Sequence, residues 1–423
     1  MKTTCLKTVV LVVAWCCTMG AWAYDLEANG IYYGITSTAD KTVEVVAGDA
    51  QYSGDVTIPA TVTYNGTTYR VTAIGDWAFS ECPGLTSISI PYNVISIGFN
   101  AFSYCSSLTS ITIPQGVTAI EDYVFSDCSS LVSVIMPEEI TSIGEAAFYG
   151  CSSLYFITLP QKLTYIGPLA FYDCRKIVTV TLPETLTFIG SSAFENCRSL
   201  ASIVIPEGVT SIGNTTFRNC NKLTSITLPS GLTTIDDYVF SDCSSLTSLS
   251  IPSGVTYIGN YAISYCTSLT SITIPAGVTF IGDVAFSDCS LREIHCVAKN
   301  PVTCGSRSFY NVDKNTCTLY VPKGSLEAYK KAYTWKDFVN IVEEEYTGIE
   351  EVGAESAGQA VITACGDGIV VENFPAGKAV TVYTLSGTVV YEGVASGSRT
   401  ELTLPAGHLY LVKCGPTVTK VAL

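Results

Sequence analysis

The sequence predicts a β-rich solenoid, a fold in which short coils of equal length stack on one another in register. Cysteine, proline and phenylalanine each recur at an interval of 23 residues along roughly half of the chain. A fixed period of this length is the signature of a repeat architecture, because each unit buries its apolar face only against its neighbours. The cysteines stand at positions 82, 105, 128, 151, 174, 197, 220, 243, 266 and 289, the prolines at 91, 114, 137, 160, 183, 206, 229, 252 and 275, and the phenylalanines at 79, 102, 125, 148, 171, 194, 217, 240, 286 and 309, with Ile263 in the one missing place.

One unit, residues 108–130, reads LTSITIPQGVTAIEDYVFSDCSS. Ile111 and Ile113 alternate with polar residues, which is the period of a strand, and Pro114 ends it because proline cannot donate to a strand ladder. A second short apolar element follows around Ile120. When such coils stack, each residue type forms a column at a spacing of roughly 4.8 Å, and the columns build one continuous core.

A block of five units is duplicated in the array. Residues 121–131 (EDYVFSDCSSL) recur almost unchanged at 236–246 (DDYVFSDCSSL). Growth by blocks tolerates any number of coils, so the count is not adjusted to a catalytic geometry. Glu121 and Asp236 replace the glycine that stands at the equivalent positions 98, 144, 167, 190, 213, 259 and 282, which indicates that this turn does not need a backbone conformation reserved for glycine.

The composition excludes several classes of protein. The chain has 423 residues, of which 48% are hydrophobic and 14% charged, and its net charge is −15. It is too apolar to be disordered, and it is longer than one compact core usually organises. An acidic surface repels phosphate backbones, so we expect no nucleic-acid partner.

Residues 1–23 predict a secretory signal peptide. Two lysines precede an apolar run, and Ala21–Ala23 forms a small-x-small cleavage site. A lipoprotein signal at Cys16 is the alternative, although the bulky Trp15 before it argues against that interpretation. No later segment holds 18 uninterrupted apolar residues, so no transmembrane span is expected.

The unit resembles the BspA-like leucine-rich repeats, a Bacteroides-type family of surface proteins with the pattern LTSITIPxxVTSIGxxAFxxCSS. The resemblance covers residues 73–295, which we therefore expect to form the leucine-rich repeat solenoid. The flanks resemble the ends of such proteins, with a β-rich N-terminal cap in residues 24–72 and a C-terminal cap in residues 296–346. The C-terminal cap is expected to hold a short helix that begins at Ser325, with Leu326, Tyr329 and Trp335 covering the last coil.

The remaining residues predict a linker and a separate β domain. Residues 347–360 are rich in glycine, alanine and glutamate, as in a linker. Residues 361–423 alternate in strand fashion and predict a small β-sandwich. Their VYTLSGTVV, LPAGHLYLVK and KVAL segments resemble the C-terminal sorting domains of type IX secretion substrates, which implies a secretion or anchoring role. A plain β accessory domain is the alternative.

The cysteines are best explained as small buried hydrophobic residues. They form one parallel file, whereas a zinc site needs four converging ligands. Disulfides between neighbouring coils are a second interpretation, although parallel Cβ vectors fit the required dihedral poorly. Two further hypotheses are one pair among Cys296, Cys304 and Cys317, and a pair of Cys365 with Cys414.

The sequence gives little support to catalysis. Its two histidines, His295 and His408, neighbour no serine or cysteine motif, and no metal-protease, phosphate-loop or EF-hand motif is present. Aspartates recur before the cysteines in phase with the repeat, which indicates surface residues more than calcium ligands. We expect no enzyme activity, no cofactor and no metal.

Most residues predicted to point outward from the first strand are serine or threonine, which satisfy one another along the ladder and resist aggregation at the edges. A few coils depart from this pattern with bulky apolar residues. Such residues mark a recognition surface or pack under loops, and the sequence leaves both interpretations open. The candidate partner-binding residues are Ile135, Tyr155 and Phe156, the pair Tyr165 and Phe188, and the pair Tyr257 and Phe280.

The resemblance implies adhesion to host matrix proteins and to other cells. The leading hypothesis is therefore an extracellular or outer-surface binding protein, an adhesin whose repeat surface recognises a host or microbial protein or glycan. The acidic surface favours basic or neutral ligands. The alternative is a structural or assembly scaffold of the cell envelope that binds no ligand.

Overall fold

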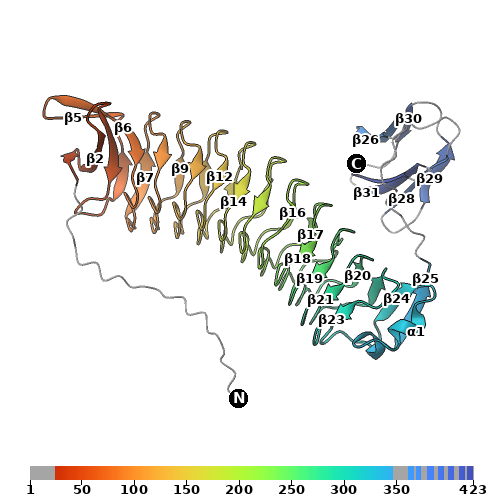
Figure 1. The fold of residues 1–423 in the computed structure, drawn as a ribbon. Helices are drawn as coiled ribbons and strands as arrows, with labels where there is room; N and C mark the ends of the chain where they lie inside the picture. The colour runs from red at the N-terminus through yellow and green to blue at the C-terminus, as the bar shows by residue number, and fades with distance from the viewer. Residues whose placement is uncertain are drawn as a thin grey trace, which may run out of the picture. The chain divides into compact units, whose positions relative to one another are not determined.

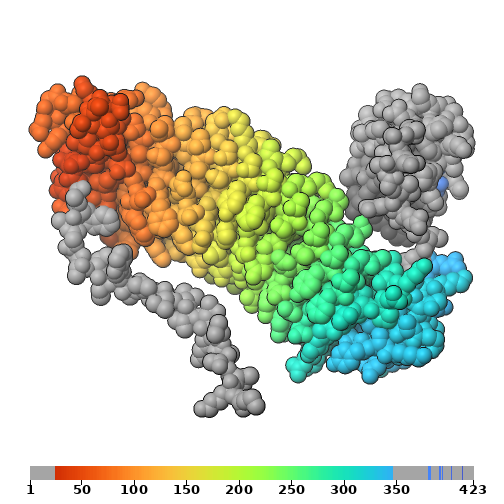
Figure 2. All heavy atoms as spheres, in the orientation of Figure 1, coloured from red at the N-terminus to blue at the C-terminus, as the bar shows by residue number. Residues whose placement is uncertain are grey.

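The computed structural model describes residues 24–345 and, beyond them, residues within seven strands between 361 and 422. The chain divides into two compact units, residues 1–346 and 347–423. The first unit is a β-solenoid of about 12 turns, as the 23-residue period predicts. Successive coils follow one another as parallel slices along this unit (Figures 1 and 2).

Most regular coils contribute one short strand to a first parallel series, here called face A, whereas residues 179–181 and 248–250 form no strand there. Register is kept at one coil per step, because Val134 pairs with Ile111 and Ile157 pairs with Val134. Ile111 and its equivalents are buried, and the residues on either side of them point outward. The strands of face A are β4 (Gly54–Thr57), β7 (Leu85–Ser89), β9 (Ser110–Thr112), β11 (Ser133–Ile135), β13 (Phe156–Ile157), β16 (Ser202–Val204), β17 (Ser225–Thr227), β20 (Ser271–Ile274), β22 (Glu293–Cys296), β24 (Thr318–Pro322) and β25 (Asn340–Glu344).

A second parallel ladder, face B, lies at the second apolar element of the coil. Ile143 pairs with Ile120 and with Ile166, again one coil per step. This ladder begins on the last strand of the N-terminal cap, where Ile74 pairs with Ile97. Its strands are β8 (Ser96–Ile97), β10 (Ala119–Ile120), β12 (Ser142–Ile143), β14 (Tyr165–Ile166), β15 (Phe188–Ile189), β18 (Thr234–Ile235), β19 (Tyr257–Ile258), β21 (Phe280–Ile281) and β23 (Thr303–Cys304).

A mixed sheet covers the N-terminal end of the solenoid. It has the order β1-β2-β3-β6-β5 with β8 also paired to β6, and the β3–β6 and β6–β8 pairs are parallel while the others are antiparallel. Beside it, Tyr52 packs its ring on Phe79 of the first coil, with ring centroids 4.6 Å apart. The first column therefore meets protein and not water. The strands are β1 (Leu26–Ala28), β2 (Ile31–Ser37), β3 (Thr42–Val46), β5 (Thr61–Tyr64) and β6 (Thr67–Ile74).

The C-terminal end is covered by two short helices, α1 (Leu326–Tyr329) and the 3-10 helix η1 (Trp335–Asp337). Tyr329 and Trp335 are buried, and the ring of Trp335 lies 5.2 Å from that of Phe309 in the last coil. Ser325 precedes the helix as predicted, but its hydroxyl donates to the carbonyl of Lys299 and forms no cap bond. The serine thus joins the cap to the coil beneath it.

Stacked phenylalanine rings form the centre of the solenoid. Consecutive rings are nearly parallel, with centroid distances from 5.1 Å for Phe79–Phe102 to 5.9 Å for Phe217–Phe240. All members of the column are buried. Ile263 fills the one place without an aromatic ring and is also buried, so the column tolerates a large aliphatic side chain.

The ten cysteines at the 23-residue interval form a second buried column beside the phenylalanines. They are free thiols, and those from Cys105 onward donate to the carbonyl oxygen 26 residues earlier, as from Cys128 to Phe102 at 3.1 Å. This confirms the interpretation as small core residues and contradicts disulfides along the ladder. The sequence did not predict the thiol–carbonyl bond. Cys296, Cys304 and Cys317 are also free, which contradicts a pair among them, whereas the side chains of Cys365 and Cys414 lie outside the described residues.

The glycine of the turn after face B is selected by close packing. At Gly167 an added Cβ would come within 2.7 Å of the backbone of Gly144, one coil away. The backbone at these glycines is not left-handed, in agreement with Glu121 and Asp236 at the same place. The left-handed residues of the turn are non-glycine ones, including Val284 with φ 59°.

The second unit contains two antiparallel sheets. One has the order β26-β27-β30 and the other β29-β28-β31-β32. Among its described side chains, Val380, Val382, Leu402 and Val412 are buried. The strands are β26 (Val361–Cys365), β27 (Gly368–Glu372), β28 (Ala379–Thr384), β29 (Val389–Val394), β30 (Arg399–Thr403), β31 (Leu409–Cys414) and β32 (Thr417–Ala422).

Truncation of one ring in the phenylalanine column should destabilise the solenoid. Phe171→Ala removes a ring stacked on both sides, at 5.3 Å from each neighbour. The resulting cavity should lower the free energy of unfolding by about 3–5 kcal/mol. Urea denaturation followed by circular dichroism measures this change. Phe171→Ile, which copies Ile263, is the control and should cost clearly less. A loss under about 1 kcal/mol for the alanine variant would contradict the stacked column.

The buried thiols should make the folded chain sensitive to alkaline pH. Burial raises the pKa of Cys105 to about 12, whereas a thiol in the unfolded chain ionises near pH 8.5. The unfolded state therefore binds fewer protons above about pH 8.5, and the free energy of unfolding falls as the pH rises from there toward the folded-state pKa. The melting temperature at pH 8 and pH 10 should drop less in Cys105→Ala than in the wild type. Equal drops in both would show that this thiol does not contribute.

Candidate ligand-binding surfaces

On face A, exposed apolar residues cluster on two neighbouring coils, and Val204 of β16 and Val342 of β25 are exposed on other coils of the same face. β11 and β13 carry Ile135 and Phe156, which are 64% and 66% exposed. Tyr155 packs edge-on against Phe156 with ring centroids 4.5 Å apart. Its backbone N–H bonds the carbonyl of Val132, which is also exposed. The sequence-predicted residues are thus brought together, and Val132 is an addition to them.

Two aromatic pairs lie on face B. Tyr165 and Phe188 are partners in strand register and stack at 4.9 Å with planes 4° apart. Tyr257 and Phe280 are also register partners and stack at 5.7 Å. The first pair is exposed and the second is half-buried. The seven predicted residues therefore make three clusters on two ladders and do not form one site.

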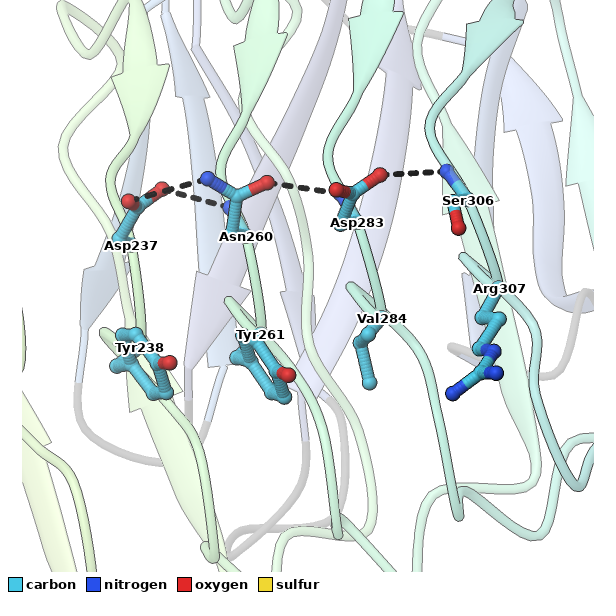
Figure 3. Close-up of a pocket in the computed structure, with 8 residues that line it drawn as sticks. All are labelled: Asp237, Tyr238, Asn260, Tyr261, Asp283, Val284, Ser306 and Arg307. Atoms are coloured by element: carbon cyan, nitrogen blue, oxygen red, sulfur yellow. Dashed lines mark hydrogen bonds between the residues drawn. The ribbon is translucent and has the colours of Figure 1, made fainter. Parts of the chain in front are cut away.

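A shallow groove of about 480 Å³ lies beside the Tyr257–Phe280 pair. Figure 3 shows its two parallel rows, one of polar side chains from Asp237 to Ser306 and one of larger side chains from Tyr238 to Arg307. Tyr238 and Tyr261 stack at 4.7 Å with planes 4° apart. Burial and the nearby carboxylate of Asp237 raise the pKa of the Tyr257 hydroxyl, which links the aromatic pair to this groove.

The polar row of the groove fastens one coil to the next. Asp237 accepts hydrogen bonds from the backbone N–H of Asn260 at 2.6 Å and from its side-chain amide at 3.2 Å. Asn260 then accepts the backbone N–H of Asp283 at 2.8 Å. Asp283 in turn accepts the backbone N–H of Ser306. These side chains are first of all structural, while the exposed edge of the row remains accessible to a hydroxyl-rich or cationic ligand.

This groove was not predicted from the sequence, although the sequence holds a signal for it. Tyr238 and Tyr261 are 23 residues apart, which is the criterion that identified the pairs on face B. The polar row leaves a weaker signal in the sequence, because aspartate and asparagine alternate within it and each bonds a backbone N–H of the next coil.

His295 is held by carboxylates on face A. Its Nδ1 lies 3.0 Å from Glu344 and its Nε2 lies 3.8 Å from Glu293. Its ring stacks on Tyr320 at 4.5 Å. These contacts account for the histidine as part of the C-terminal cap. His408 lies outside the described residues.

The described part of the chain holds no group of three or more His, Cys, Asp or Glu side chains that could bind a metal ion. In the same residues, no helix has both the length and the apolar character that a membrane crossing requires. The signal peptide predicted for residues 1–23 and the linker at 347–360 fall outside the described residues.

Three solved structures illustrate the similarity to known folds. A leucine-rich repeat protein of Bacteroides ovatus is 27% identical, with 76% of this chain and 100% of that chain covered and a TM-score of 0.43. A leucine-rich cell-surface protein of Faecalibacterium prausnitzii is 29% identical, with 64% and 94% covered and a TM-score of 0.38. The pneumococcal vaccine antigen PcpA is 19% identical, with 77% and 99% covered and a TM-score of 0.47.

The family comparison rests on the repeat itself. No curated protein matches the chain. The model of the BspA type leucine-rich repeat region matches residues 72–201 and 187–316. These ranges together span more than half of the chain and contain the cysteine and phenylalanine columns described above. The chain therefore belongs to the BspA type leucine-rich repeat family.

Proposed function

We propose that this protein is an exported binding protein, an adhesin that recognises an extracellular protein or glycan through its repeat surface. One observation carries the proposal: bulky apolar side chains are exposed at positions where most other coils carry serine, threonine or alanine. Phe156, for example, occupies the position that Ser133 holds in the preceding coil. An apolar cluster of this kind gains free energy when a partner covers it.

The location outside the cytoplasm rests on two supports. The first is the predicted signal peptide at residues 1–23. The second is membership of the BspA type family, because the resemblance of the repeats to that family implies a surface protein. The role of residues 361–423 as a sorting or anchoring domain is part of the same proposal. Surface labelling of cells that express the chain with and without residues 347–423 would test it, because an anchoring role requires that the shortened chain is lost from the surface.

The arrangement of the clusters favours binding to an extended partner. The three clusters lie on two ladders, and between the two pairs on face B stand coils with the small residues Ser211 and Thr234 at the corresponding positions. A partner that contacts several coils would gain from each cluster in turn. Tyrosine and phenylalanine are suited to this, because aromatic side chains supply large contact areas at low cost in conformational entropy.

The test is binding of the mature chain to immobilised host matrix proteins, such as fibronectin, collagen and laminin, and to whole bacterial cells. Ile135→Thr, Phe156→Ser and Phe188→Ser replace exposed residues by types that other coils carry at those positions, so the fold should persist. A change in a cluster that lies at the centre of the interface should weaken binding by about 2 kcal/mol, or roughly 30-fold.

Tyr92→Ser is the matched control, because Tyr92 is exposed but belongs to none of the three clusters. It should leave the dissociation constant unchanged. Circular dichroism and the melting temperature check that each variant is folded. If no ligand of the panel binds, or if binding is indifferent to all three cluster changes, the adhesin proposal fails and the scaffold function is favoured.

A further inference from the structure

The edge of the solenoid at the cysteine column has a different composition in three consecutive coils. We call the five residues centred on each cysteine the cysteine edge. In other coils this edge reads SDCSS or a close variant, as at residues 126–130 and 241–245. At residues 172–176 it reads YDCRK, at 195–199 ENCRS, and at 218–222 RNCNK. Basic residues thus enter at positions that are otherwise serine.

This substitution concentrates positive charge on an acidic protein. Between residues 73 and 290 the chain has six lysines and arginines, and five of them lie on these three cysteine edges. The position before the cysteine, aspartate in four coils, becomes Asn196 and Asn219 in the second and third of them. Basic groups are therefore gained at one place, where two aspartates are lost and one carboxylate, Glu195, is gained. The five basic residues are Arg175, Lys176, Arg198, Arg218 and Lys222.

Several of these charges are free to meet a ligand. Lys176, Arg198 and Lys222 are exposed, and within residues 24–345 none of them forms an ion pair. Arg175 is exposed but makes a two-pronged contact with Asp173, at 2.7 Å for each nitrogen. Three unpaired cations on neighbouring coils are therefore available.

Arg218, the remaining basic residue of the three cysteine edges, is held by contacts with its neighbours. Its guanidinium lies 3.5 Å from Glu195, a carboxylate that is only 10% exposed, and 5.5 Å from the ring centre of Tyr238. Within the patch, five basic side chains face two largely covered carboxylates, those of Asp173 and Glu195. The local potential is therefore positive although the whole chain carries −15.

The spacing of these groups is set by the solenoid. Arg175 and Arg198 occupy equivalent positions one coil apart, which is about 4.8 Å along the axis for parallel strands. Lys176 and Lys222 occupy equivalent positions two coils apart, or about 10 Å. The result is a short basic strip that runs along the axis, with its groups at regular intervals.

We propose that this strip binds a linear anionic polysaccharide, whose carboxylate or sulfate groups pair with Lys176, Arg198 and Lys222. The flanking coils support this choice. They present serine pairs, such as Ser152–Ser153 and Ser244–Ser245, that can bond sugar hydroxyls on both sides of the charged centre. Long nucleic acids fit less well, because they need many phosphate contacts and meet an otherwise acidic surface. The inference rests on the proposed function only in requiring that the repeat array is displayed outside the cell.

The experiment measures binding of the mature chain to immobilised heparin, with uncharged dextran as the blank. The triple variant Lys176→Ser, Arg198→Ser, Lys222→Ser installs the residue that neighbouring coils carry, so it should fold. Its affinity for heparin should fall at least about tenfold at low salt, and wild-type binding should weaken as ionic strength rises, because exposed charges are screened. Unchanged affinity in the triple variant would overturn the site.

The control triple variant Arg70→Ser, Lys331→Ser, Lys336→Ser removes the same charge from exposed positions elsewhere. It should retain heparin binding, and an equal loss would show that only net charge matters. Polyglutamate and single-stranded DNA serve as competitors, and competition as strong as that of heparin would overturn the choice of a glycan. The aromatic variants Phe156→Ser and Phe188→Ser should still bind heparin, so failure of this proposal is distinguishable from failure of the adhesin proposal.

Discussion

The structure depends on register between coils of equal length. A coil on its own cannot bury its apolar residues. Burial requires the next coil, which supplies a stacked phenylalanine ring, a carbonyl acceptor for the thiol and a paired strand. A shift of one residue would turn the buried side of a strand outward. Departures from the 23-residue step accordingly appear at the C-terminal end of face A, where Glu293 pairs with Ser271 and Thr318 pairs with Glu293. There the cap, with Tyr329 and Trp335, takes over the burial.

This constraint separates the interior from the surface. Inside, almost every coil presents the same residues, because any change must fit two neighbours at once. On the outside, a side chain makes few contacts with the neighbouring coils. One coil can therefore carry Phe156 and the next Thr179 on the same face without a change in fold. The array therefore offers extended surfaces in preference to a deep pocket. The groove lined by Asp237 and Tyr238 is shallow and open to solvent (Figure 3).

The sequence predicted the interior well because the interior repeats. The period alone identified both strand elements of the coil and the columns of phenylalanine and cysteine. The contact between Cys128 and the carbonyl of Phe102 was not predictable, since it joins residues 26 apart and depends on how the turn is wound. Left-handed backbone at Val284 runs against the intrinsic preference of a β-branched residue, so only the packing of the coils explains it. At the surface, the aromatic pairs were predictable because their bulky residues stand 23 residues apart in the sequence.

The basic strip is visible in the charges at equivalent positions of the coils, although the composition of the whole chain is acidic. A net charge of −15 describes the average surface and led to the expectation of basic or neutral ligands. A solenoid does not present an average to its partners, because each residue type is arranged in files along one axis. Arg198 lies beside Arg175 and apart from the carboxylates of Glu184 and Glu207, which occupy another position of the coil. The charge that a ligand meets is set by the file it contacts, so one acidic chain can hold an apolar cluster for one partner and a cationic strip for another. Since the residue carried by the other coils fits each of these positions, loss of binding can be separated from loss of folding.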